Sequence, residues 1–153
     1  MRIKNIRERP ISLSDPMSNA GISYLHMTAS AVAIDIDAGE KGMVTGYGFS
    51  SVGRYAQSGL IAERFAPRLM ACEELESTDG GLDPVRAWAS MMTNEKSGGD
   101  GDRAGAIGVL DMALWDAAAK IEGMPLWQLL SERFNEQKYH GHVPVYATGG
   151  HYY

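Results

Sequence analysis

The chain has 153 residues, 44% of them hydrophobic, with 19 acidic against 14 basic residues and a net charge of −5. This length and apolar content suit one domain with a core of its own. The charge balance argues against a nucleic-acid partner, and no apolar run approaches the roughly 20 residues that span a bilayer. The single Cys72, and a start too charged for a secretory signal, predict a soluble cytoplasmic chain.

Three strands are predicted in the first third of the chain. Alternating residues predict a strand over 1–9, which Pro10 ends or places at a sheet edge, and a loop follows over 12–23. A second strand over 24–37 and a returning strand over 43–49 complete a predicted antiparallel meander.

Helices are predicted after a loop over 49–55. The first covers 57–66 and is stopped or kinked by Pro67, and the second starts with Asp83 as N-cap and Pro84 in the first turn. The predicted buried face of the second helix consists of Trp88, Met91 and Met92.

The stretch 106–130 predicts a long helix, a glycine stop at Gly123 and a short second helix that begins around Pro125. The apolar stripe of the long helix is Ile107, Leu110, Leu114, Ala117, Ala118 and Ile121. Asp111 and Asp116 stand among these apolar residues. Five residues apart on a helix, they point about 140° from each other, so we interpret them as structural carboxylates, with metal ligation as the alternative.

A polar linker over 134–142 leads to a further predicted strand over 143–148. Strands followed by helices make the predicted fold class α+β. The last strand has no partner left in the sequence, and an unpaired apolar edge favours aggregation.

Several short patterns hint at chemistry without completing a site. The run that starts at Gly46 lacks the third glycine and the βαβ context of a dinucleotide-binding motif. Asp100 and Asp102 lack the later ligands of a calcium loop. His140 and His142 lack a Cys or carboxylate at matching spacing, so we interpret them as exposed linker residues.

Lys96 lies in the small-residue run NEKSGG, where an ammonium group can reach an anionic ligand without competing bulk. From the residues alone, an anion-binding lysine and a plain surface lysine are equally open interpretations.

Longer runs resemble the enolase superfamily, in its mandelate racemase and muconate-lactonizing branch. AIGVLDMALWDAAAK followed by GMPLWQLL resembles the end of the N-terminal capping domain of that superfamily. NEKSGG, GRYAQSGLIAERFAPR, LDPVRAWASMM and VYATGGHYY resemble, more narrowly, acid-sugar dehydratases of the D-tartrate dehydratase type. The resemblance covers the whole chain and implies a capping domain over 1–140 and the truncated start of a (β/α) barrel over 141–153.

This resemblance implies the substrate-specificity portion of a Mg²⁺-dependent acid-sugar dehydratase that acts on tartrate or a related aldarate or aldonate. A base removes the proton α to a carboxylate, Mg²⁺ stabilises the enediolate, and the β-hydroxyl leaves. Cap loops over 12–23 and 49–55 cover the barrel mouth.

Four substrate-binding residues are implied by the same resemblance: Lys96, Asn19, Ser50 and Val52. Lys96 faces the far carboxylate of an aldaric acid. Ser50 and Val52 stand where the tartrate-like pattern has asparagines, so we expect a substrate that differs in a stereocentre or in chain length.

No catalytic residue and no metal ligand is expected in this chain, because a barrel takes about 250 residues and would carry the Mg²⁺ ligands and the base. We therefore expect a lyase fragment, inactive alone, that belongs with a missing barrel domain and forms a homo-oligomer when complete. Two alternatives stay open: a stand-alone binding or assembly module derived from the capping domain, and an unrelated small α+β domain.

Overall fold

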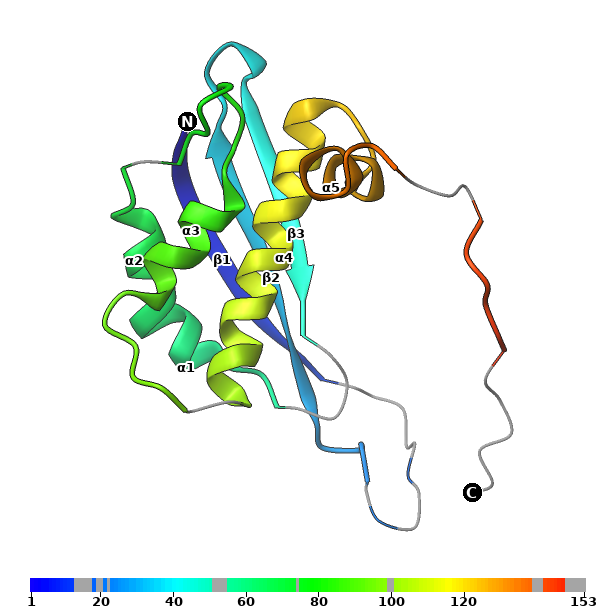
Figure 1. Cartoon of the computed structure of the whole chain (residues 1–153). Helices are drawn as coiled ribbons and strands as arrows, with labels where there is room; N and C mark the ends of the chain where they lie inside the picture. Colours follow the sequence, from blue (N-terminus) through cyan, green and yellow to red (C-terminus); the bar gives the residue numbers. More distant parts are fainter. Residues whose placement is uncertain are drawn as a thin grey trace.

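The structure, a computed structural model, describes residues 1–12, 18, 21, 23–50, 55–73, 75–98, 101–138 and 142–147. Within them, a three-stranded sheet carries helices on one face (Figure 1). Two of the residues predicted to bind substrate, Asn19 and Val52, lie outside the described residues.

The sheet is antiparallel in the order β1-β2-β3, which confirms the predicted meander and the α+β class. Its strands are β1 (Arg2–Ser12), β2 (Thr28–Asp37) and β3 (Met43–Phe49). β1 continues through Pro10, which pairs in register with Ser30. An edge strand tolerates a proline, so Pro10 does not end β1.

Three short helical segments follow one another after β3: α1 (Ser58–Leu60), η2 (Ile61–Phe65) and α2 (Ala66–Met70). Of the two predicted effects of Pro67, the stop is wrong, because the helical run continues to Met70. Pro67 falls in the first turn of α2, directly after the π-helix η2.

Helix α3 (Pro84–Met92) begins as predicted, because the Asp83 carboxylate accepts hydrogen bonds from the backbone N–H groups of Val85 (3.0 Å) and Arg86 (3.2 Å). Met91 is fully buried, but Trp88 is 44% exposed, so the prediction that Trp88 is buried is wrong. The buried face follows Ala87, and Trp88 lies about 100° further round the helix.

Helix α4 (Asp102–Glu122) crosses the sheet face and buries every member of the predicted stripe. It ends at Gly123 with φ of 70°, the left-handed conformation that glycine adopts without strain. Helix α5 (Leu126–Phe134) then packs against the C-terminal half of α4 (Figure 1).

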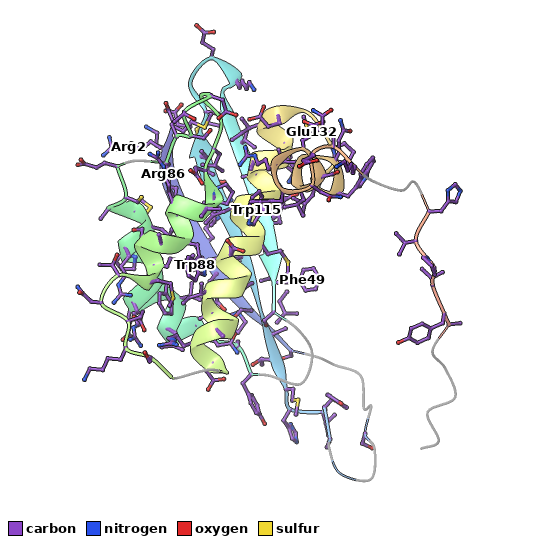
Figure 2. The ribbon with its side chains drawn as sticks, viewed as in Figure 1. Arg2, Phe49, Arg86, Trp88, Trp115 and Glu132 are labelled. Atoms are coloured by element: carbon purple, nitrogen blue, oxygen red, sulfur yellow. The ribbon has the colours of Figure 1, made fainter. Side chains whose placement is uncertain are left out.

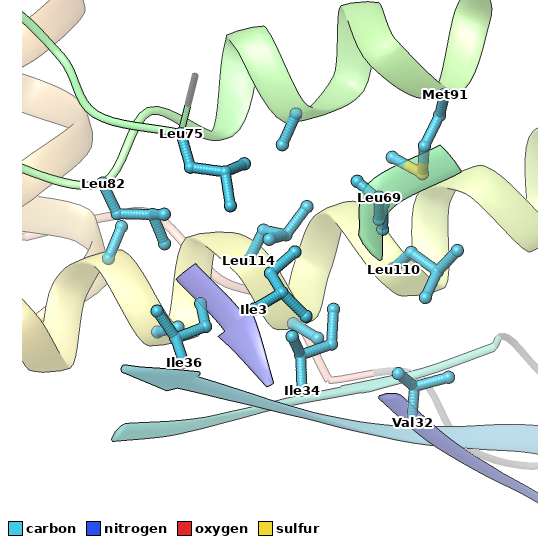
Figure 3. Close-up of a cluster of buried hydrophobic side chains, with 14 of the residues drawn as sticks. Ile3, Val32, Ile34, Ile36, Leu69, Leu75, Leu82, Met91, Leu110 and Leu114 are labelled. Carbon is cyan, nitrogen blue, oxygen red and sulfur yellow. The ribbon is translucent and has the colours of Figure 1, made fainter. Parts of the chain in front are cut away.

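The core lies between the sheet and α4 (Figure 3). Its labelled members come from β1, β2, α2, α3, α4 and the segment before α3: Ile3, Val32, Ile34, Ile36, Leu69, Leu75, Leu82, Met91, Leu110 and Leu114. One continuous cluster therefore joins strands and helices that are distant in the sequence.

Residues 142–147 lie outside any helix or strand, although a strand was predicted over 143–148. Val143, Val145 and Tyr146 are 77%, 89% and 86% exposed. This prediction is wrong for the described residues, because no described strand pairs with their backbone groups, and pairing is what makes a strand. In the part of the chain that the structure covers, no helix is both long and apolar enough to cross a membrane.

Candidate functional site

Lys96 lies in the turn that follows α3. Asn94 enters this turn with φ of 59°, and an open hollow of about 340 Å³ lies beside it. The hollow is lined by Arg64, Asn94, Glu95, Lys96, Ser97, Gly98 and Arg103. The Lys96 side chain is exposed, and among the described residues its ammonium group has no hydrogen-bond or ion-pair partner. It is therefore available to an anion that enters the hollow.

Glu95, the neighbour of Lys96, has a side chain that is only 1% exposed. Three arginines hold its carboxylate. Arg64 donates through Nε to Oε1 (2.9 Å) and through Nη2 to Oε2 (2.8 Å), and Arg68 Nη1 donates to Oε1 (2.7 Å). Arg103 Nη1 lies 3.4 Å from Oε2. Since these arginines belong to η2, α2 and α4, Glu95 ties the turn to three elements.

The backbone of the turn is also fixed by these arginines. Arg103 Nη1 donates to the carbonyl oxygen of Lys96 (2.6 Å), and Arg68 Nη1 donates to the carbonyl oxygen of Met91 (2.6 Å) at the end of α3. The main chain at Lys96 is therefore held in place while its ammonium group stays free.

The electrostatics of the hollow favour anions. Hydrogen bonding from Arg68 lowers the pKa of the Glu95 carboxyl; burial opposes this effect, and the charges of Arg64 and Arg68 add to it. Glu95 is thus ionised at neutral pH. Its one negative charge stands against four positive ones on Arg64, Arg68, Arg103 and Lys96, so these five residues leave positive charge in excess.

The predicted cap loops leave and rejoin the fold at one end of the sheet, where β1 ends, β2 begins, β3 ends and α4 begins (Figure 1). Ser50 is 8% exposed, and its hydroxyl accepts a hydrogen bond from the Ser30 N–H (2.8 Å). Beyond residues 51–54, the N–H of Ala56 donates to Thr28 Oγ1 and that of Gln57 donates to Ser30 Oγ, both at 3.0 Å. The chain on both sides of Val52 is therefore fixed to the start of β2.

Of the four predicted substrate-binding residues, the structure describes Lys96 and Ser50. It does not bring them together, because Ser50 is not among the residues that line the Lys96 hollow. A substrate contact remains a prediction for each. The Glu95 network was missed at the sequence level, and its one local signal is the spacing of Arg64 and Arg68, four residues apart on one helix face.

The two carboxylates of α4 have different surroundings. Asp116 accepts hydrogen bonds from the Tyr47 N–H (2.8 Å) and from Lys120 Nζ (2.6 Å), which confirms a structural role. Asp111 makes no hydrogen bond or ion pair within the described part of the chain.

No three His, Cys, Asp or Glu side chains among the described residues lie close enough together to hold a metal ion. His26 and His142 are exposed. His140, His151 and Asp100 lie outside the described residues.

The fold and the helices that carry this site match a known family. Residues 5–131 match the family described as mandelate racemase / muconate lactonizing enzyme, N-terminal domain. The chain belongs to this family. The mandelate racemase / muconate lactonizing N-terminal domain, called the capping domain below, thus accounts for the sheet and for helices up to α5.

Individual relatives agree with this assignment. A stretch of 46 residues, 29% of this chain, is 55% identical to 10% of a D-galactonate dehydratase family member RspA from Halomonas elongata. The crystal structure of a mandelate racemase/muconate lactonizing enzyme-like protein from Rubrobacter xylanophilus superposes with a TM-score of 0.52 at 21% identity, over 82% of this chain and 32% of that one. A racemase from Streptomyces coelicolor with bound magnesium superposes with a TM-score of 0.50 at 19% identity, over 75% of this chain and 31% of that one.

The solved structures share the fold at low identity, so they support the architecture and not a particular reaction. The chain spans about a third of the length of those structures and a tenth of the curated relative. These matches therefore do not show the activity of a whole enzyme.

Proposed function

We propose that this capping domain recognises the substrate of a Mg²⁺-dependent acid-sugar dehydratase, and that Lys96 binds the far carboxylate of an aldaric acid such as tartrate. The observation that carries the proposal is the free ammonium group of Lys96 in an electropositive hollow with a fixed backbone. The name of the Halomonas elongata relative, a dehydratase family member, supports the reaction class.

The charge of the substrate explains why such a lysine is needed. An aldarate carries a carboxylate at each end, and the one next to the reacting carbon is bound where the proton is removed. The other carboxylate needs a cation elsewhere, and a lysine supplies a point charge on a flexible stem that adapts to substrates of different length.

The other proposed contacts lie in the two cap loops. Asn19 brings an amide that can bond a hydroxyl or carboxylate, and Ser50 fixes the start of the second loop through Ser30. Val52 offers no hydrogen bond, so the proposed substrates include, besides tartrate, related aldarates that differ from it in a stereocentre or in chain length.

We assign Mg²⁺ and the base to a barrel domain that follows a cap over 1–140, with 141–153 as its beginning. In a complete enzyme, which we propose to be a cytoplasmic homo-oligomer, this domain binds and orients the acid and excludes water.

The binding role can be tested by titrating the ¹⁵N-labelled chain with tartrate and following the backbone amides of residues 94–98. We expect saturable shifts in the wild type, none with the neutral analogue threitol, and loss of the shifts in Lys96→Met. Lys138→Met is the matched control, because Lys138 is exposed and pairs only with Glu136 among the described residues. Equal shifts in Lys96→Met and the wild type would contradict the proposal.

The division of labour has its own test. Purified chain with Mg²⁺ should leave tartrate and other aldarates unchanged, because the proposed base and metal ligands are not in this domain. Formation of a keto-acid product, measured by its reaction with semicarbazide, would show that the chemistry had been assigned to the wrong part of the protein.

A further inference from the structure

A second groove, of about 250 Å³, lies between α3 and α4. Trp88 and Met92 of α3 and Ile107 and Asp111 of α4 form its walls, and Arg103 stands at one end. Figure 2 shows Trp88 on the helical side of the domain, beside α4. The groove is separate in its chemistry from the Lys96 hollow, because its walls are mostly apolar and its unpaired charge is negative.

Asp111 is the unexplained residue of this groove. It stands in the middle of α4, where aspartate is a poor helix former, and it has no hydrogen-bond or ion-pair partner among the described residues. Partial burial raises the pKa of its carboxyl. An unpaired carboxylate in apolar surroundings costs free energy, so the fold of this domain alone gives no reason for an acid at this position.

The surroundings of Asp111 define what would pair with it. Trp88 presents an indole that is 44% exposed, and a Cβ added at Gly108 would meet no atom within 4 Å, so the groove is open above α4. An aromatic face next to a carboxylate suits a guanidinium group, which stacks on the ring and donates paired hydrogen bonds to the acid. A lysine ammonium lacks the flat face that stacking uses.

Arg103 does not supply that guanidinium. Its Nη1 is engaged by the Lys96 carbonyl oxygen and by Glu95. It also precedes Asp111 by eight residues, which places the two Cα atoms about 12 Å apart along the helix axis.

We infer that the α3–α4 groove is a docking surface for an arginine that a protein surface outside this chain presents among apolar residues, with the guanidinium between Asp111 and Trp88. Charge complementarity selects this occupant, and the apolar walls match the aliphatic stem of arginine. In the solved relatives, about two-thirds of the chain lies outside the part that matches this domain, and that remainder is a source of protein surface that could present such an arginine. This inference does not depend on the proposed substrate.

The experiment uses the ¹⁵N-labelled chain and n-butylguanidinium as a mimic of the arginine side chain. We expect a saturable shift of the Trp88 indole N–H that is lost in Asp111→Asn, a variant that removes no described contact. Glu63→Gln is the control, since Glu63 is an exposed acid outside the groove and its loss should leave the shift unchanged. The neutral isostere n-butylurea should cause no shift.

Absence of a saturable shift, an equal shift with n-butylurea, or an equal shift in Asp111→Asn would overturn the inference. Sedimentation velocity of the wild type and of Asp111→Lys tests the other occupant. A dimer that this charge reversal abolishes would identify a second copy of the chain in the groove and would also overturn the assignment.

Discussion

Glu95 and Lys96 are neighbours in the sequence with opposite surroundings in the structure. The Glu95 side chain is 1% exposed and bound by three arginines, whereas the Lys96 ammonium is exposed and free within the described part of the chain. The buried acid anchors the turn so that the adjacent cation can be presented without being neutralised. Glu95 therefore positions the turn, and the proposed role of Lys96 is to bind an anion.

Replacing Glu95 with glutamine should destabilise the domain in a pH-dependent way. Because the folded-state pKa of Glu95 is lowered, its ionised form stabilises the fold above the unfolded pKa of about 4.3, and this contribution is lost as pH falls through the lower folded value. In urea unfolding, the free energy of unfolding of the wild type should be well above that of Glu95→Gln at pH 7. At pH 4 the two free energies should lie closer together.

Glu136→Gln is the control for this comparison, because the Glu136 side chain is 81% exposed and pairs with Lys138 alone among the described residues. If the difference in free energy of unfolding between wild type and Glu95→Gln were the same at both pH values, the shape of the side chain and not its charge would account for the effect.

Strand β3 and helix α4 approach so closely that their backbones touch. A Cβ at Gly46 would lie 2.0 Å from the carbonyl oxygen of Ala113, and one at Gly48 would lie 2.1 Å from that of Val109. The contact is reinforced by Lys120, which donates to the Thr45 carbonyl oxygen (2.9 Å). The two glycines that suggested a nucleotide-binding motif are therefore explained by helix–sheet packing.

Gly46→Ala and Gly48→Ala should each destabilise the domain by about 1–3 kcal/mol or more, because the added methyl group meets backbone atoms that cannot turn aside. Gly108 of the same helix lines the open α3–α4 groove, where the Cβ of Gly108→Ala meets nothing within 4 Å. This substitution should stabilise the domain by about 0.5–1 kcal/mol, the cost of glycine inside a helix. Chemical unfolding of the three variants measures whether each free energy of unfolding falls or rises. A Gly48→Ala variant as stable as the wild type would contradict the close approach of β3 and α4.

The elements differ in how far the sequence could predict them. β3 and the start of α3 were predicted correctly, since the turn before β3 and the Asp83–Pro84 cap are local signals, and the stripe of α4 follows its own period. The π-helix before Pro67 was not predicted, because it depends on how Ile61 and Phe65 pack in the core. The arginines around Glu95 could not be predicted either, since residues 31 positions apart meet only in the tertiary structure.

Strands and helices share one core, and Glu95 ties the turn at Lys96 to them, so the described part of residues 1–138 is expected to unfold as a single unit. Residues 142–147 do not belong to that core, and their valines and tyrosine are exposed. Two readings of the chain predict different behaviour here. A module that folds alone should unfold cooperatively as a monomer, whereas a fragment that depends on a barrel should aggregate through its uncovered apolar residues.

Deleting residues 139–153 distinguishes these readings. The described residues in this segment bury almost no surface, so the shortened chain should keep the urea midpoint of the full chain and scatter less light when heated. Deleting residues 124–153 is the contrasting truncation, because it also removes α5. Leu129 is 3% exposed, and the ring of Phe134 packs edge-on against Trp115 at 5.8 Å, so this loss should cost at least about 2 kcal/mol. If removing residues 139–153 lowered the urea midpoint as much as removing α5, residues 139–153 would be part of the folded domain. A binding measurement on residues 1–138 alone would then not report the substrate specificity of that domain.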